Sequence, residues 1–299
     1  VGAEADDDYR TWFDPKKVLG DDLPEIGRPE FVAIVSSSVL ATSLAKKTEG
    51  EVNGFVVEGH AAGGHNAPPR GAFELNDRGE PMYGPRDEVD LSKIKRLGLP
   101  FWLAGACDYP EKLREALDAG ASGVQIGTSF AFCNESGLPT QTRDELIQDV
   151  LNGSVDVVTD PCVSPAGFPF KVIQKAGSLS DKLVYDLRKR VCDLGYLTTF
   201  YKKPDGSIGY RCPAEPVASF VAKGGDIQDT IGRKCLCNAL MANVGLAQAR
   251  ATGYVEQLLL TAGDCLRELA RFVSERRATY SAAEVISYML QTASAAKVG

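Results

Sequence analysis

The sequence has almost no histidine: its 299 residues include only two, His60 and His65. It also lacks an excess of positive charge, with 33 lysines and arginines against 40 aspartates and glutamates and a formal net charge of -7. This balance argues against nucleic-acid binding, which normally requires a basic surface. No apolar run approaches the roughly 20 residues of a membrane-spanning helix, so we expect no membrane span.

Targeting signals and cysteine pairs are also lacking. The first residues, VGAEADDD, resemble neither a signal peptide nor a transit peptide. The eight cysteines are scattered without a secretory marker, so we expect a cytoplasmic protein with reduced thiols. Cys192, Cys212, Cys235 and Cys237 lie in the second half, but their spacing lacks the two CxxC pairs of a zinc ribbon. We therefore expect buried free thiols there and no metal site.

Buried strands alternate with amphipathic helices over the first part of the chain. Continuous apolar strands in such an alternation predict a parallel sheet within an α/β fold. The predicted strands are 30–38, 53–59, 99–106 and 122–130, and the predicted helices are 39–49, 89–97 and 110–121. Only four strand–helix units are visible, which fits either an open α/β domain or half of an eight-stranded barrel.

The pattern divides the chain into three parts. Residues 1–30 are polar and proline-punctuated, and we interpret them as a connector with one helical turn near Pro15. Residues 31–175 form the α/β unit. Residues 176–299 are predicted to be mainly helical, with a hairpin near 198–211 that turns at Pro-Asp-Gly. The helices expected in this last part are 213–222, 234–250, 253–273 and 282–292.

Small and polar residues gather where the predicted strands end. The carboxyl ends of parallel strands share one edge of the sheet, so these residues should converge on a ligand. Gly105 and Gly127 lie where strands give way to helices, and such positions let backbone N–H groups approach a phosphate. Thr128 can add a hydroxyl to the same anion. The alternative is that small residues end strands for packing reasons alone.

Both histidines lie in the stretch EGHAAGGHNAPPRG. Gly63 and Gly64 would let the chain pass close to a flat ligand, and His65 could then act as a general base. Two other interpretations remain open: a histidine of a surface loop, or a metal site made by Glu58, His60 and His65.

Three segments together resemble the nitronate monooxygenase family, formerly called 2-nitropropane dioxygenases. Glu58, Gly59, Ala62, Gly63, Gly64 and His65 stand as the EGxxAGGH motif of that family's FMN-binding TIM barrels. LAGA (103–106) and VQIGTSFAFCNESG (124–137) are similar to the following two strands, which hold the FMN phosphate. The family's first four strands have no counterpart, so the chain looks like the C-terminal part of a longer family member, with barrel strands five to eight.

The resemblance assigns roles to individual residues. His65 would be the catalytic base. His60 departs from the family pattern and would be either a substrate contact or a solvated neighbour. Phe168 would contact the substrate and, with Phe170 in SPAGFPF, cover the flavin, unless the two rings only pack within their loop. Ala106 departs from the family, which usually has glycine there, and its methyl group would crowd the phosphate. The residues expected to hold FMN are Gly63, Gly64, Gly105, Ala106, Gln125, Gly127 and Thr128.

The activity implied by the resemblance is FMN-dependent oxidation of nitronates or nitroalkanes by oxygen, giving a carbonyl compound and nitrite. One alternative is an enoyl-thioester reductase that uses NAD(P)H and FMN, because the related enoyl-acyl-carrier-protein reductases share the AGGH segment. Another is a non-catalytic barrel remnant or a metal-stabilised binding module. The expected partners are a small-molecule substrate and oxygen, and an oligomer is compatible with the sequence.

Overall fold

The computed structural model describes residues 13–21, 27–47 and 50–291. Its main sheet has four parallel strands in the order β1 (Val32–Val35), β2 (Gly54–Glu58), β3 (Phe101–Ala104) and β4 (Gly123–Gln125). The predicted α/β class and all four predicted strands are therefore confirmed. The fourth strand is shorter than predicted because helix α5 (Thr128–Ala131) begins just after it.

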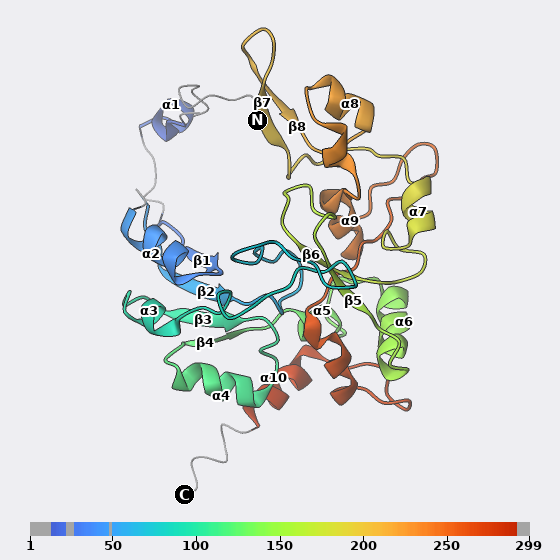
Figure 1. The fold of residues 1–299 in the computed structure, drawn as a ribbon. Helices are drawn as coiled ribbons and strands as arrows, with labels where there is room; N and C mark the ends of the chain where they lie inside the picture. Colours follow the sequence, from blue (N-terminus) through green and yellow to red (C-terminus); the bar gives the residue numbers. More distant parts are fainter. Residues whose placement is uncertain (1–12, 22–26, 48–49, 292–299) are drawn as a thin grey trace, which may run out of the picture.

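Three helices cover one face of this sheet (Figure 1). They are α2 (Ser38–Lys47), α3 (Leu91–Lys95) and α4 (Pro110–Asp118), and they bury Ala41, Ile94 and Ala116 against the strands. The ends of α4 follow from its sequence, because Pro110 occupies the first helical turn and Gly120 just beyond the end has a φ of 91°. One face of the sheet is thus a conventional apolar core.

The opposite face of the sheet has an exposed apolar side chain on its edge strand, β1. Ile34, Val56 and Trp102 form one row across β1, β2 and β3, on the face away from these helices. Ile34 is 57% exposed, whereas Val56 is buried. Glu58 and Gln125 belong to the next row on the same face, at the carboxyl end of the strands. This face and edge border the cavities described below.

The rest of the chain forms two antiparallel pairs and several short helices. β5 (Val157–Asp160) pairs with β6 (Phe170–Ile173), and β7 (Thr199–Lys202) pairs with β8 (Ile208–Arg211) as the predicted hairpin. The other helices are α1 (Pro15–Leu19), α6 (Thr140–Leu151), α7 (Lys182–Leu187), α8 (Val217–Ala222), η1 (Ile227–Thr230), α9 (Leu236–Asn243), η2 (Asp264–Arg271) and α10 (Ala282–Leu290). Among the described residues no helix is long and apolar enough to cross a membrane.

The helix predicted at 253–273 is wrong in its first half. Residues 258–263 run without helical structure, and only Asp264–Arg271 form a 3-10 helix. The carbonyls of Leu258 and Leu260 accept hydrogen bonds from the backbone N–H groups of Leu179 (2.7 Å) and Ile173 (2.9 Å). Tertiary burial thus overrides the helical pattern of LLLTAG, and the helices after residue 176 are shorter than predicted.

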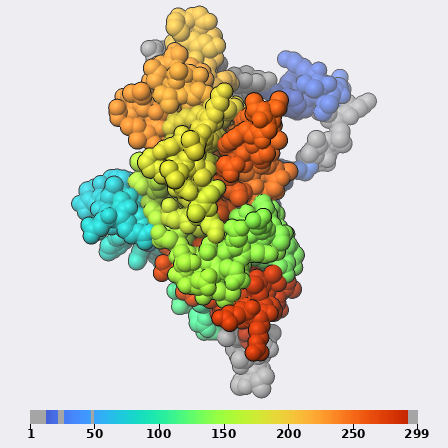
Figure 2. Space-filling model, turned by 90° about the vertical axis from the view of Figure 1, so that its right-hand side faces the viewer, coloured from blue at the N-terminus to red at the C-terminus, as the bar shows by residue number. Residues whose placement is uncertain are grey.

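The segment after residue 258 returns to the α/β unit. Leu260, Leu266 and Leu269 are buried in a second core together with Leu146 and Ile147 of α6. Figure 2 shows the face on which α6 and the C-terminal elements lie side by side, with the loop that precedes α3 at the edge. This return brings residues 261–264 against the loop that follows β2, where the predicted site lies.

Candidate functional site

Two neighbouring cavities lie at the carboxyl edge of the parallel sheet. The first, of about 290 Å³, is called the glycine cavity here. It is lined by all seven residues that were expected to hold the cofactor: Gly63, Gly64, Gly105, Ala106, Gln125, Gly127 and Thr128. The second, of about 430 Å³, is called the histidine cavity and is lined by His60, His65 and Phe168. Glu58 lines both cavities, so the predicted cofactor and substrate residues fall into two adjoining groups.

The turn after β3 has an unusual backbone. Gly105 has a φ of 98°, and the next residue, Ala106, has a φ of 51°. Ala106 is the only residue other than glycine with a positive φ in the described part of the chain. A left-handed conformation costs an L-residue about 1–2 kcal/mol, and such strain tends to gather at functional sites. Ala106 therefore occupies a position whose backbone favours glycine.

Gly63 and Thr128 both contact the segment that returns to the α/β unit. A Cβ on Gly63 would lie 2.8 Å from the carbonyl carbon of Ala262 and from the nitrogen of Gly263. The Thr128 hydroxyl accepts a hydrogen bond from the Gly263 backbone N–H (2.9 Å). The close approach that needs a glycine is made by the protein's own returning segment. Both residues still line the cavity.

Gly64 is also tied to the returning segment. Its N–H donates to the Thr261 hydroxyl (2.8 Å), and its φ of 76° lies in the left-handed region that glycine tolerates. Asp264 N–H donates to the Ala61 carbonyl (3.0 Å). The returning segment thus forms one wall of the glycine cavity, through Thr261, Ala262, Gly263 and Cys265, which no sequence motif had indicated.

A buried ion pair lies beside the glycine cavity. Asp108 lines it and is 1% exposed, and its Oδ2 accepts hydrogen bonds from Arg271 (2.7 Å) and from the Ser129 hydroxyl (2.6 Å). The Arg271 guanidinium lies over the Tyr109 ring at 4.3 Å. Because the carboxylate is paired, the cavity does not present an uncompensated negative charge to an anion.

His65 is held by a serine that sequence reasoning missed. Its Nε2 lies 2.6 Å from the Ser164 hydroxyl, and Ser164 is fully buried. The Ser164 oxygen also accepts the Ala166 N–H (3.2 Å), and the Ser164 carbonyl accepts from Arg233 (2.6 Å). This loop fixes the imidazole, while Nδ1 has no hydrogen-bond partner among the described residues. Burial lowers the pKa of His65 below its usual value.

Two phenylalanines surround the same imidazole in different ways. Phe170 lies in β6, is 1% exposed and meets the His65 ring edge-on at 4.9 Å. Phe168 is 47% exposed, also lies edge-on to His65 at 6.4 Å and lines the histidine cavity. Phe170 is therefore part of the core, and Phe168 is the ring available to a ligand.

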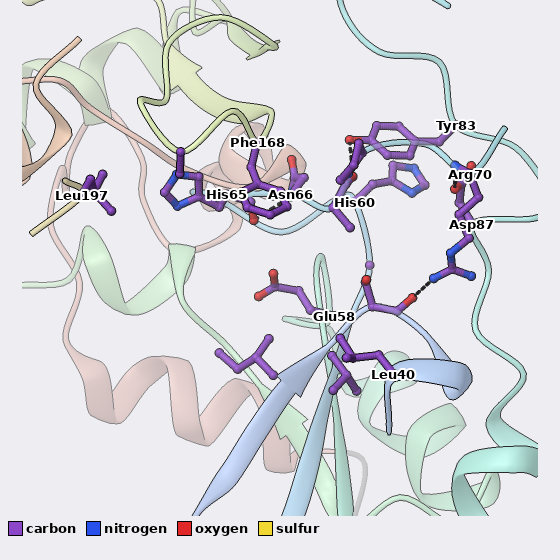
Figure 3. Close-up of a pocket in the computed structure, with 17 residues that line it drawn as sticks. Leu40, Glu58, His60, His65, Asn66, Arg70, Tyr83, Asp87, Phe168 and Leu197 are labelled. Atoms are coloured by element: carbon purple, nitrogen blue, oxygen red, sulfur yellow. Dashed lines mark hydrogen bonds between the residues drawn. The ribbon is translucent and has the colours of Figure 1, made fainter. Parts of the chain in front are cut away.

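Glu58 points into the space between the strand ends and the side chains of His65 and Phe168 (Figure 3). Its carboxylate has no hydrogen-bond or ion-pair partner among the described residues. Burial raises its pKa above the usual value. Glu58 does not hydrogen-bond to the backbone of the loop, and its place between the cavities makes it a second acid–base candidate.

His60 is turned away from His65 (Figure 3). Its ring stacks on Tyr83 at 4.4 Å with an interplanar angle of 8°. Tyr83 belongs to the long loop before α3 and donates its hydroxyl hydrogen to the Ala67 carbonyl (3.1 Å). On the same wall, Arg70 donates to the Ser36 and Arg86 carbonyls. The described His, Cys, Asp and Glu residues include no metal-binding group, so the metal interpretation of Glu58, His60 and His65 gains no support.

The first part of the chain matches a known family. Residues 28–160, which are less than half of the chain, match the family model described as nitronate monooxygenase. A nitronate monooxygenase of Pseudomonas aeruginosa is 40% identical over 91 residues, which are 30% of this chain and 24% of that protein. A Bacillus subtilis protein described as a probable nitronate monooxygenase is 33% identical over 93 residues, 31% of this chain and 25% of that protein.

The matched segment spans about a quarter of the length of each of these two relatives. Among solved structures, that of a nitroalkane oxidase from Streptomyces ansochromogenes is similar with a TM-score of 0.46 and 17% identity. The similarity covers 90% of this chain and 58% of that one.

Proposed function

We propose that this chain carries strands five to eight of an FMN-binding TIM barrel. We further propose that it takes part in the oxidation of nitronates or nitroalkanes by oxygen, giving a carbonyl compound and nitrite. The observation that carries the proposal is the pair of adjoining cavities, one lined by the glycine-rich strand ends and the other by His65, with Glu58 between them. The family match over residues 28–160 supports the same activity.

The exposure of Ile34, on the face of the sheet away from α2, α3 and α4, supports the barrel. Parallel sheets are normally covered on both faces or closed into a barrel. Here helices cover one face, while Ile34 on the other face is 57% exposed at the edge strand β1. In a closed barrel this face would point inward, and Glu58 and Gln125 would lie at the top of the barrel interior.

The glycine cavity fits the phosphate-bearing part of FMN. A Cβ on Gly127 would meet no atom within 4 Å, so this strand end is open to a ligand. Gly105, Ala106, Gln125 and Gly127 would hold the cofactor there, whereas Gly63 and Thr128 already contact residues 262–263. When bound, FMN accepts the electrons of the substrate and passes them to oxygen.

His65 is the residue that removes the substrate proton. When Nε2–H donates to the Ser164 hydroxyl, Nδ1 carries the free lone pair and is the atom that accepts the proton from the carbon next to the nitro group. Because burial lowers its pKa, His65 is neutral near pH 7 and ready to act as a base. Phe168 contributes an apolar wall that limits access of water to this proton.

One experiment tests the proposal against its alternatives. The protein is incubated with FMN, separated from free cofactor, and mixed without oxygen with either a nitronate or NAD(P)H. Bleaching of the flavin by the nitronate alone supports the proposal. Bleaching by NAD(P)H alone supports the enoyl-thioester reductase, and a chain that retains no FMN contradicts both.

A further inference from the structure

Four cysteines that lie far apart in the sequence line one small cavity in the C-terminal region. Its volume is about 10 Å³, which is room for about one water molecule or ion. The four residues, called the thiol cluster here, are Cys192, Cys212, Cys235 and Cys237. They come from the loop after α7, the end of β8 and the start of α9, in the upper part of Figure 1.

The thiol cluster is a small buried group beside an apolar core. The group consists of Cys212, Ala214 and Cys235, with Cys237 packed against it. Leu236, which also lines the thiol cavity, belongs to the neighbouring apolar core. Buried groups of this size are commonly held together by disulfides or a metal ion.

We propose that the thiol cluster binds one zinc ion through its four sulfurs. Binding replaces four S–H bonds with four Zn–S bonds, releases the protons to water and leaves zinc in the +2 state. The sulfurs do not yet have ligand geometry, and no three described His, Cys, Asp or Glu residues form a metal-binding group as they stand. Binding therefore requires rotation of cysteine side chains about Cα–Cβ, a single torsion with three staggered positions.

The sequence favoured free thiols because the four ligands come from three separate segments rather than from two CxxC pairs.

The zinc ion would also stabilise one wall of the histidine cavity. Leu197 lines both the thiol cavity and the histidine cavity, and Pro165, which lines the former, directly follows Ser164. Fixing the thiol cluster would thus fix the loop that holds His65.

Metal analysis of the purified 299-residue chain tests this proposal. The chain is produced in zinc-supplemented cells, purified without chelators and analysed by mass spectrometry of its metals. We expect one zinc per chain, released when a mercurial reagent blocks the thiols. The double variant Cys235→Ser/Cys237→Ser should contain less than about one tenth of the zinc that the unaltered chain contains. The matched control is Cys162→Ser, which removes an exposed thiol outside the cluster and should keep the full zinc content.

A second measurement avoids dependence on the folding of the double variant. Cobalt(II) added to the metal-free, unaltered chain should give the sulfur-to-cobalt absorption of a tetrahedral thiolate site, and zinc should protect four thiols from a thiol reagent. The proposal is overturned if the chain holds no zinc and shows neither the cobalt absorption nor the protection. It is also overturned if the cluster is found to hold iron or a disulfide.

Discussion

The glycine cavity and the histidine cavity share Glu58 but are lined by different kinds of chemical groups. The glycine cavity is made of backbone turns and small residues, and residues 261–263 of the returning segment form one of its walls. The histidine cavity is made of side chains that carry rings and titratable groups. The difference implies that an added methyl group should harm the first cavity, whereas loss of a functional group should harm the second.

The largest expected effect is the loss of turnover when His65 in the histidine cavity is replaced. His65→Asn removes the base but leaves the glycine cavity unchanged. We expect turnover of a neutral nitroalkane to fall by about 10²–10⁴-fold, the usual contribution of a general base. FMN affinity, measured by fluorescence titration, should stay the same.

The matched control for this change is His60→Asn, because His60 stacks on Tyr83 and is turned away from His65. Turnover by this variant should stay within a few-fold of the unaltered chain. Equal losses in the two variants would mean that His65 has no special role as a base.

The second-largest expected effects come from alanine substitutions at two glycines of the glycine cavity, one of which should lower stability and the other FMN binding. Gly63→Ala places a Cβ 2.8 Å from backbone atoms of Ala262 and Gly263, which should cost about 2–3 kcal/mol of unfolding free energy. Gly127→Ala meets no atom within 4 Å, so it should leave the unfolding free energy nearly unchanged. It should nevertheless weaken FMN binding about tenfold, which corresponds to about 1.4 kcal/mol.

Chemical denaturation and FMN titration of both glycine variants check these values. If Gly127→Ala bound FMN as tightly as the unaltered chain, the glycine cavity would not be where the cofactor lies.

A smaller effect concerns the pH dependence set by Ser164. Activity requires neutral His65, so kcat/KM should fall as pH drops through a pKa below about 6.5, the ordinary histidine value, because burial lowers it. The Ser164 hydroxyl accepts the Nε2–H hydrogen bond and stabilises the protonated ring of His65 more than the neutral ring. Ser164→Ala removes this acceptor and therefore lowers the pKa of His65. The acid limb should therefore move to still lower pH, and the plateau should fall about tenfold.

Ser164→Thr keeps the hydroxyl and should restore the position of the acid limb. An acid limb that is the same in the alanine variant and the unaltered chain would show that the 2.6 Å contact does not tune His65.

The smallest effect is a gain in stability. Ala106→Gly relieves a φ of 51° and should raise the unfolding free energy by about 0.5–1 kcal/mol. Ala119→Gly is the control, because Ala119 has a φ of -70° and the change should lower stability instead. Thermal unfolding of the two variants should therefore shift in opposite directions.

The strands and strand ends could be predicted from the sequence because their signals are local. Apolar runs such as FVAIV and FVV predict buried strands wherever they occur, and parallel topology then brings their carboxyl ends to one edge. This is why Gly105 and Gly127, which are 22 positions apart in the sequence, line the same cavity.

The returning segment and the thiol cluster could not be predicted because they depend on long-range contacts. Residues 258–263 are apolar enough to suggest a helix, but hydrogen bonds to Ile173 and Leu179 hold them without helical structure. Ser164 stands 99 positions from His65, and no local sequence pattern connects the two residues. Whether Gly63 faces a ligand or the chain itself is decided by that returning segment.

We propose that the two cavities serve one reaction, in which flavin is held in the glycine cavity and the proton is removed in the histidine cavity. The most direct measurement is anaerobic bleaching of protein-bound FMN by a neutral nitroalkane without NAD(P)H, compared between the unaltered chain and His65→Asn. We expect rapid bleaching in the unaltered chain, whereas FMN should stay bound and oxidised in His65→Asn. Equal bleaching in both, or no FMN bound to either, would contradict it.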